Sequence, residues 1–120
     1  MQRVILCTGK VAFDAIAERD RRQAPAAAVV RIEQLFPFPM DQILAILERY
    51  SGTKDVVWLQ EEPENMGAWT YVEHRIFRLK YQGYELRNVT RVESGSPATG
   101  SATIHEQELA DLMEDAFRDL

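Results

Sequence analysis

Apolar residues along the chain follow two alternating patterns, one typical of buried strands and one typical of amphipathic helices. Apolar runs predict strands at residues 4–7, 27–32, 56–59 and 84–92. Apolar residues spaced by three and four predict helices at residues 10–22, 40–50 and 104–120, and one from a cap at Asn65 to about Lys80. This order, strand then helix four times over, favours an α/β fold whose mostly parallel sheet is covered by helices on both faces.

The runs also predict where strands lie in the sheet and where elements end. The runs at 4–7 and 56–59 are continuously apolar, which is typical of strands buried on both faces. Residues 84–92 alternate between apolar and polar, which places this strand nearer an edge. Residues 35–39 contain two prolines and form a stiff connector, because proline cannot continue a helix or a central strand. Thr103 and Glu106 have capping-box spacing before the last helix.

Chain length, net charge and cysteine content indicate the number of domains, the kinds of partner and the compartment. The 120 residues form one domain, 1–120, long enough to bury a sizeable core. Lys and Arg number 14 and Asp and Glu 19, so the net charge is −5, which disfavours a nucleic-acid partner. No apolar run approaches the roughly 20 residues that span a bilayer, so no membrane partner is expected. Cys7 is the single cysteine, which favours a reducing, cytoplasmic compartment.

Common catalytic and metal-binding motifs are absent from the sequence. There is no phosphate-binding glycine loop, no GxGxxG turn, no CxxC and no HExxH. His74 and His105 are interpreted as surface polar residues, because no nucleophile accompanies either in the sequence. Cys7 ends a buried strand and is interpreted as a small core residue rather than a reactive thiol.

Two polar segments are candidates for chemistry. Glu61, Glu62 and Glu64 follow the third strand, at the sheet edge where α/β folds bind ligands, and a carboxylate pair there would serve as acid and base. The simpler interpretation is an acidic loop facing solvent or a partner's basic surface. The loop at 94–101 precedes a helix and would hold an anion through its backbone N–H groups or, more simply, be a tight turn. The anion-binding candidates within it are Ser96, Thr99, Gly100 and Ser101.

Four segments, in this order, resemble the C-terminal domain of the thiamine-dependent 2-oxoglutarate dehydrogenases. They are residues 3–10 (RVILCTGK), 30–39 (VRIEQLFPFP), 58–69 (WLQEEPENMGAW) and 96–101 (SPATGS), the last followed by His105. The resemblance implies a transketolase C-terminal-like domain, a three-layer α/β/α sandwich with a mostly parallel sheet of four or five strands. It also implies that the whole enzyme decarboxylates 2-oxoglutarate on thiamine diphosphate with magnesium and passes the succinyl group to a lipoyl-bearing succinyltransferase.

The resemblance carries no catalytic, cofactor-binding or metal-binding residue onto this chain, since those groups belong to preceding domains of the family. It implies an enzyme of the tricarboxylic acid cycle, in the cytoplasm or, for a eukaryotic source, the mitochondrial matrix. Some relatives respond to nucleotide or acyl-CoA effectors. Here Pro39 is followed by Met40, Asp41 and Gln42, with no basic cluster to hold phosphates.

Two classes of function follow from these observations. The first is a structural domain, inactive alone, that assembles with upstream domains or a second subunit of a homodimeric dehydrogenase. Its expected contact surface comprises Gln60, Glu61, Glu62 and Asn65, with Trp69 as the aromatic anchor or, alternatively, as a core residue. The second is a stand-alone domain that binds a small ligand or anion at the carboxyl edge of its sheet.

Overall fold

The computed structural model of the chain describes residues 1–91 and 102–120, and within them four strands alternate with helices. The strands are β1 (Arg3–Cys7), β2 (Ala27–Arg31), β3 (Asp55–Pro63) and β4 (Glu85–Arg91). The helices are α1 (Val11–Arg22), α2 (Met40–Arg49), α3 (Trp69–Ile76), α4 (Arg78–Tyr81) and α5 (Ala102–Ala116). In the described ranges, every predicted strand and helix has a counterpart, with shifted boundaries.

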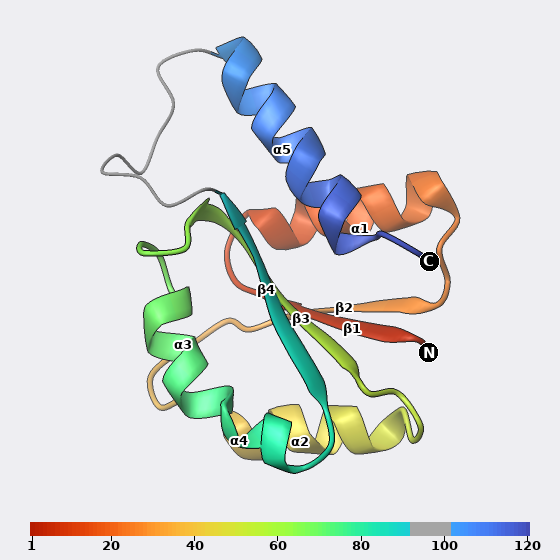
Figure 1. Cartoon of the computed structure of the whole chain (residues 1–120), viewed down its shortest axis with the longest axis vertical. Helices are drawn as coiled ribbons and strands as arrows, with labels where there is room; N and C mark the ends of the chain where they lie inside the picture. The colour runs from red at the N-terminus through yellow and green to blue at the C-terminus, as the bar shows by residue number, and fades with distance from the viewer. Residues whose placement is uncertain (92–101) are drawn as a thin grey trace.

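The four strands form one sheet in the order β2-β1-β3-β4, and all the pairs are parallel (Figure 1). The apolar β1 lies inside the sheet, whereas β4, with its alternating pattern, lies at one edge as predicted. Parallel strands need a crossover connection, and each helical segment between strands supplies one. The predicted α/β fold with a parallel sheet is therefore confirmed.

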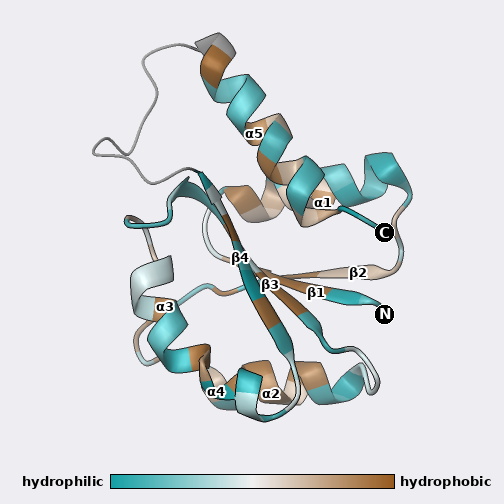
Figure 2. Cartoon of the chain, in the orientation of Figure 1, coloured by the Kyte–Doolittle hydropathy of each residue, from teal (hydrophilic) through white to brown (hydrophobic). Residues whose placement is uncertain are grey.

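Helices cover both faces of the sheet and make three layers. Helices α1 and α5 lie on one face, and α2, α3 and α4 lie on the other (Figure 1). Alternate residues of β1 point to opposite faces, so Ile5 packs under α1 and α5 while Leu6 packs against the other helices. The central strands are largely hydrophobic (Figure 2). Leu112 and Phe117, which the sequence predicts on the apolar face of the last helix, are buried in the hydrophobic core between the sheet and helices α1 and α5.

The third strand extends further than the sequence predicts. Its polar residues from Gln60 onward were expected to form an acidic loop, but the backbone stays paired with β4 as far as Pro63, opposite Arg91. The pairing is irregular between Leu59 and Pro63. The prediction was wrong because polarity marks where side chains leave the core, whereas the backbone continues to satisfy its hydrogen bonds in the ladder.

The helix after β3 begins later than expected and has a different cap. Asn65 was predicted as the cap, but α3 starts at Trp69, and the preceding Ala68 offers no capping side chain. Instead, Oε1 of Gln60 accepts a hydrogen bond from the N–H of Trp69 at 2.8 Å. The cap therefore comes from the neighbouring strand and not from the local sequence.

The single long helix predicted to about Lys80 is divided into α3 and α4. Phe77 separates the two helices, and its carbonyl accepts a hydrogen bond from the N–H of Lys80 at 3.1 Å. None of the helices in the described ranges is both long enough and apolar enough to cross a membrane.

Candidate functional site

The loops after β1 and β3 meet at the carboxyl edge of the sheet, where the chain reverses its direction of winding. From β1 the chain moves to β2 on one side, then returns to β3 on the other side. In open α/β sheets such a switch point leaves a crevice in which ligands bind. This edge is therefore the place to look for a functional site, and it brings Lys10 next to Glu61.

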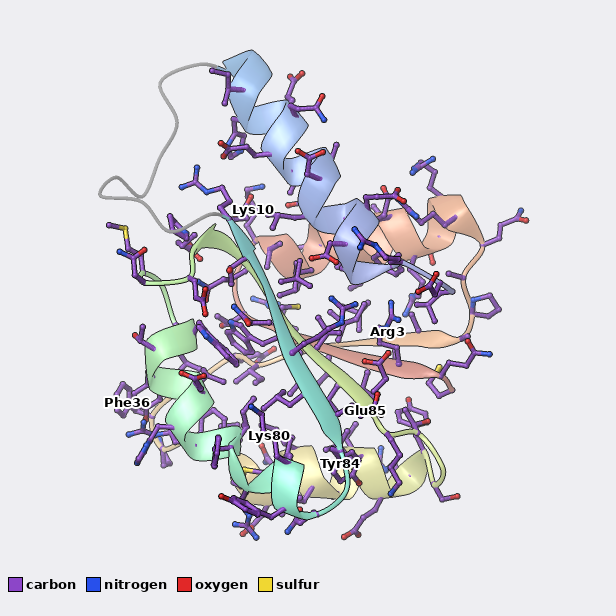
Figure 3. All side chains as sticks on the ribbon, viewed as in Figure 1. Arg3, Lys10, Phe36, Lys80, Tyr84 and Glu85 are labelled. Atoms are coloured by element: carbon purple, nitrogen blue, oxygen red, sulfur yellow. The ribbon has the colours of Figure 1, made fainter. Side chains whose placement is uncertain are left out.

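Lys10 is an exposed cation at this edge (Figure 3). Its Nζ lies 3.0 Å from Oδ2 of Asp14 and 3.3 Å from Oε1 of Glu61. The hydrogen bond to Asp14, and then the charge of Glu61, raise the pKa of Lys10 above its ordinary value. Oε1 of Glu61 is shielded from solvent, so the ammonium of Lys10 compensates a carboxylate that water reaches poorly.

Arg91, at the end of β4, connects three elements beneath the same edge. Its Nε donates to the carbonyl oxygen of Glu61 at 2.8 Å, and its Nη1 donates to Oε2 of Glu108 on α5 at 2.6 Å. The side chain of Arg91 is largely buried. A void lined by Glu61, Arg91, His105 and Glu108 measures only about 10 Å³, the space of about one water molecule. The charged groups here hold β3, β4 and α5 together, and the void between these described residues is too small for a substrate.

Gln60 organises the segment that follows β3. It is 3% exposed, and its Oε1 accepts hydrogen bonds from Trp58 Nε1 at 2.9 Å and from the N–H of Trp69 at 2.8 Å. Its Nε2 donates to the carbonyl oxygens of Pro63 at 2.9 Å and Met66 at 2.8 Å. A buried amide that uses both its oxygen and its nitrogen in this way is a structural group, since no polar atom is left to bind a partner.

Trp69, the expected interface anchor, lies inside the domain. It is 5% exposed and packs in the core formed with α2, α3 and α4. Of the two placements that the sequence allowed, the structure has the core placement, and the N–H of Trp69 donates a hydrogen bond to Gln60 at the start of α3. Trp69 and Gln60 therefore offer almost no surface to a partner, whereas Glu61 and Glu62 are half-buried and Asn65 is exposed.

Gly67 allows the close approach expected of a small residue, but the approach is internal. Its φ is +66°, and a Cβ atom there would lie 2.9 Å from Oε1 of Glu62. Only glycine adopts this conformation readily and leaves room for the carboxylate. The segment from Gln60 to Trp69, which comprises the end of β3 and the turn before α3, is thus closed by its own contacts.

The other candidates divide between core and surface. Cys7 is fully buried, and burial raises the pKa of its thiol to about 12, as expected for a core residue rather than a nucleophile. His74 and His105 are exposed, in agreement with their interpretation as surface residues. Ser96, Thr99, Gly100 and Ser101, the candidate anion loop, lie outside the described residues.

Sequence reasoning missed Lys10 and Arg91 as members of this edge. The signal was available, since each cation comes within three residues of the end of a predicted strand. The carboxyl ends of parallel strands lie at one edge of the sheet. Cations at the ends of β1 and β4 are therefore expected near Glu61 and Glu62, at the end of β3.

Comparison with known proteins identifies the family. The family described as 2-oxoglutarate dehydrogenase C-terminal matches residues 1–117. The chain belongs to this family. The 2-oxoglutarate dehydrogenase E1 component of Cupriavidus necator is 41% identical over 120 residues, which are 100% of this chain and 13% of that protein. Those of Exiguobacterium and Haemophilus influenzae are each 38% identical, over 98% of this chain and 12% of the relative.

Membership of the 2-oxoglutarate dehydrogenase C-terminal family confirms the resemblance found in the sequence. The chain spans only 12 to 13% of the length of these relatives, so it corresponds to a small part of them. The segment 58–69, the longest that carries the resemblance, is the one that Gln60 organises.

The described residues of this family member do not fit the thiamine diphosphate and magnesium that the resemblance implies for the whole enzyme. No group of three or more potential ligands among His, Cys, Asp and Glu comes together in residues 1–91 and 102–120. At the carboxyl edge, Glu61 is occupied by Lys10 and Glu108 by Arg91. No catalytic step is therefore assigned to this edge.

Proposed function

We propose that this chain is the C-terminal assembly domain of a 2-oxoglutarate dehydrogenase E1 component and is inactive by itself. The observation that carries the proposal is the internal use of the segment 58–69. Its most buried polar side chain, Gln60, forms hydrogen bonds with Trp58, Trp69 and nearby backbone carbonyls. A segment characteristic of the family thus serves to shape this domain, which supports a structural role.

The surface that we assign to assembly lies at the carboxyl edge and beside α3. Glu61, Glu62 and Asn65 belong to it, without the buried Gln60 and Trp69. Exposed aromatic side chains adjoin this edge, with Phe13 on α1 and Phe36 in the connector after β2. Exposed aromatic residues beside the polar groups of one surface suit a contact with a partner. The occupant is the remainder of the enzyme, which in the relatives makes up nearly nine-tenths of the chain.

In the complete enzyme the preceding polypeptide would bind thiamine diphosphate and magnesium and decarboxylate 2-oxoglutarate. The complete enzyme would be a cytoplasmic homodimer, and a lipoyl-bearing succinyltransferase would accept the succinyl group. This domain would contribute shape and contact area, with no ligand to the cofactor.

A chimaera tests the assembly role. In the Cupriavidus necator relative, the region matching this chain is replaced by residues 1–120. We expect the chimaera to be dimeric and active, the relative truncated before this region to fail in assembly, and the 120-residue chain to give no thiamine-dependent turnover. A truncated relative that stays dimeric and fully active would contradict the proposal, as would turnover by the chain alone.

The alternative is a stand-alone domain that binds a small ligand or an anion at the carboxyl edge, and the described charges there do not favour an anion. The cations Lys10 and Arg91 face three carboxylates, those of Asp14, Glu61 and Glu108. The cluster is therefore net negative, which opposes an anion. A thermal-shift screen with nucleotides and acyl-CoA separates the two, because only the alternative predicts a rise in melting temperature.

A further inference from the structure

The basic side chains are partnered differently on the two faces of the sheet. In the described part of the chain, the arginines of α1 and the arginine that follows α5 all form ion pairs with carboxylates. On the other face, the exposed Arg78 and Lys80 of α4 have no carboxylate within ion-pairing distance among the described residues. The same is true, within those residues, of the exposed Lys54 just before β3. These cations are therefore available to an anionic group from outside the domain.

Aromatic rings are exposed beside these cations. Phe77 is 42% exposed and Tyr81 82% exposed, and their ring centroids lie 5.5 Å apart. Nζ of Lys80 lies 5.1 Å from the ring centroid of Phe77, and Nζ of Lys54 lies 4.9 Å from that of Tyr84 (Figure 3). We call this surface the α4 corner, and its residues are Lys54, Phe77, Arg78, Lys80, Tyr81 and Tyr84.

The two rings of the α4 corner lie outside because the same helical segment already buries its other side. Ile76 and Leu79 are fully buried in the core formed with α2 and α3. The N–H of Tyr84 donates to the carbonyl of Leu79 at 3.0 Å, which holds the segment against the start of β4. Turning Phe77 or Tyr81 inward would remove these residues from a close-packed core. The rings are thus a fixed part of the surface.

The local charge of the α4 corner is positive, although the whole chain carries −5. Residues 73–85 contain three arginines or lysines and two glutamates, and Lys54 adds a fourth cation, so the local charge is +2. The ammonium groups of Lys54 and Lys80 lie over aromatic rings, a contact that leaves their N–H donors unused by carboxylates. The corner therefore attracts anionic groups.

The size of this positive region indicates the kind of anion. The remainder of the chain carries −7, so it would repel a nucleic acid or a lipid surface whose negative charge extends beyond the corner. A short protein segment brings a few carboxylates to the corner alone. Such a segment also carries apolar side chains, from which exposed aromatic rings gain contact energy.

We propose that the α4 corner docks a short acidic segment of a second protein. Its carboxylates bind Lys54, Arg78 and Lys80, and an apolar side chain packs against Phe77 and Tyr81. The corner lies at the start of β4, whereas the assembly surface lies at the carboxyl ends of the strands (Figure 1). The docking site is therefore separate from the proposed assembly role and does not depend on it.

Peptide titration of the 120-residue chain provides the first test. The probe is a synthetic peptide of repeated Glu-Glu-Leu units, and its control is the same peptide with Gln in place of Glu. We expect the acidic peptide to shift the amide NMR signals of Phe77, Lys80 and Tyr81 and to bind more weakly as salt is raised. Equal binding of the control peptide, or shifts confined to other elements, would overturn the proposal.

Substitutions at exposed positions provide the second test, and the same spectra show that each variant is folded. We expect Arg78→Glu to weaken binding of the acidic peptide about fivefold or more, because like charges then meet. Arg31→Glu is the matched control, since Arg31 is exposed after β1 pairing ends and lacks a carboxylate partner in the described ranges. We expect it to change the affinity less than about twofold. Tyr81→Ser should also weaken binding, which charge attraction alone does not predict.

The remaining outcomes identify a different occupant. Tighter binding to polyuridylate, or to vesicles of phosphatidylglycerol, than to the acidic peptide would overturn the proposal in favour of a nucleic acid or a membrane. Loss of the dimer on introducing Arg78→Glu into the chimaera would assign the corner to the enzyme's own assembly and overturn docking of a second protein. Failure of the chimaera to assemble without any substitution contradicts only the assembly role, because the peptide titration uses the 120-residue chain.

Discussion

Gln60 shows how much one side chain can determine in this domain. Its amide joins the indole of Trp58, the first turn of α3 and the carbonyls of Pro63 and Met66. All these groups are buried or partly buried, so water replaces the amide poorly. The conformation of the longest segment that carries the resemblance therefore depends on a residue that sequence analysis placed at an interface.

Replacing Gln60 by Ala should destabilise the domain severely. Each buried donor or acceptor that loses its partner costs about 1–3 kcal/mol, so we expect a loss of about 3 kcal/mol or more in the free energy of unfolding. The measurement is urea denaturation followed by tryptophan fluorescence. Gln42→Ala, at an exposed position of α2, is the matched control and should change this free energy by less than about 0.5 kcal/mol. Equal midpoints for the two variants would show that Gln60 does not organise the loop.

At the scale of elements, α5 is held at its C-terminus by arginines from the sheet. Its last turn contains no basic residue. Instead, Nη1 of Arg3 donates to the carbonyl of Ala116 at 2.8 Å, and Nη2 of Arg87 donates to the carbonyl of Asp115 at 3.1 Å. These cations satisfy carbonyls that a helix end leaves free and oppose its negative dipole. The strands thereby position the helix that closes one face of the sheet.

Arg3→Met tests this anchoring. The guanidinium of Arg3 is buried and also contacts Asp55 at 2.8 Å, so the substitution leaves a carboxylate and a helix carbonyl without their partner. Breaking a buried pair costs about 3–5 kcal/mol, and because Asp55 is partly exposed we expect about 3 kcal/mol. Arg49→Met on the exposed surface of α2 is the control. Chemical denaturation of both variants measures the difference, and a loss no larger than that of the control would contradict the anchoring role.

At the scale of the whole molecule, the chain termini and the proposed contact surface lie at different edges of the sheet. Both termini lie at the amino edge, near the starts of β1 and β2 (Figure 1). The carboxyl edge is thus free of chain ends, and Phe36 stands 71% exposed there, beside α3 (Figure 3). Its ring centroid lies 4.5 Å from that of Tyr71, which supports the ring without covering it. This geometry suits the contact with the remaining enzyme that we propose.

Phe36→Ser should weaken assembly while leaving the fold intact. In the 120-residue chain we expect a stability change below about 1 kcal/mol, since the ring is mostly in water already. In the chimaera we expect weaker dimerisation or docking, measured by analytical ultracentrifugation and thermal unfolding. Tyr81→Ser serves as the control. Tyr81 lies just before β4, at the amino edge of the sheet, and its side chain is 82% exposed. If both substitutions affect assembly equally, the carboxyl edge is not the contact surface.

The sequence by itself determined the layered α/β fold, the order of its elements and the family. These properties are predictable because strands buried on both faces must be apolar throughout, and because apolar residues in a surface helix must recur every three to four positions. Cys7 and Leu112 show this well, since their burial follows from position in such a pattern. The resemblance was equally readable, because it depends on short segments in a fixed order.

Only the tertiary structure decided which polar residues are structural. Gln60, Trp69 and Arg91 are ambiguous in the sequence, because an amide, an indole or a guanidinium suits an interface as well as a buried network. Their placement depends in part on partners nine or more residues away, such as Trp69 for Gln60 and Glu61 for Arg91. Long-range hydrogen bonds leave no periodic trace in a sequence. The place of β2 at an edge is likewise a property of the assembled sheet, since the order of strands in space differs from their order along the chain.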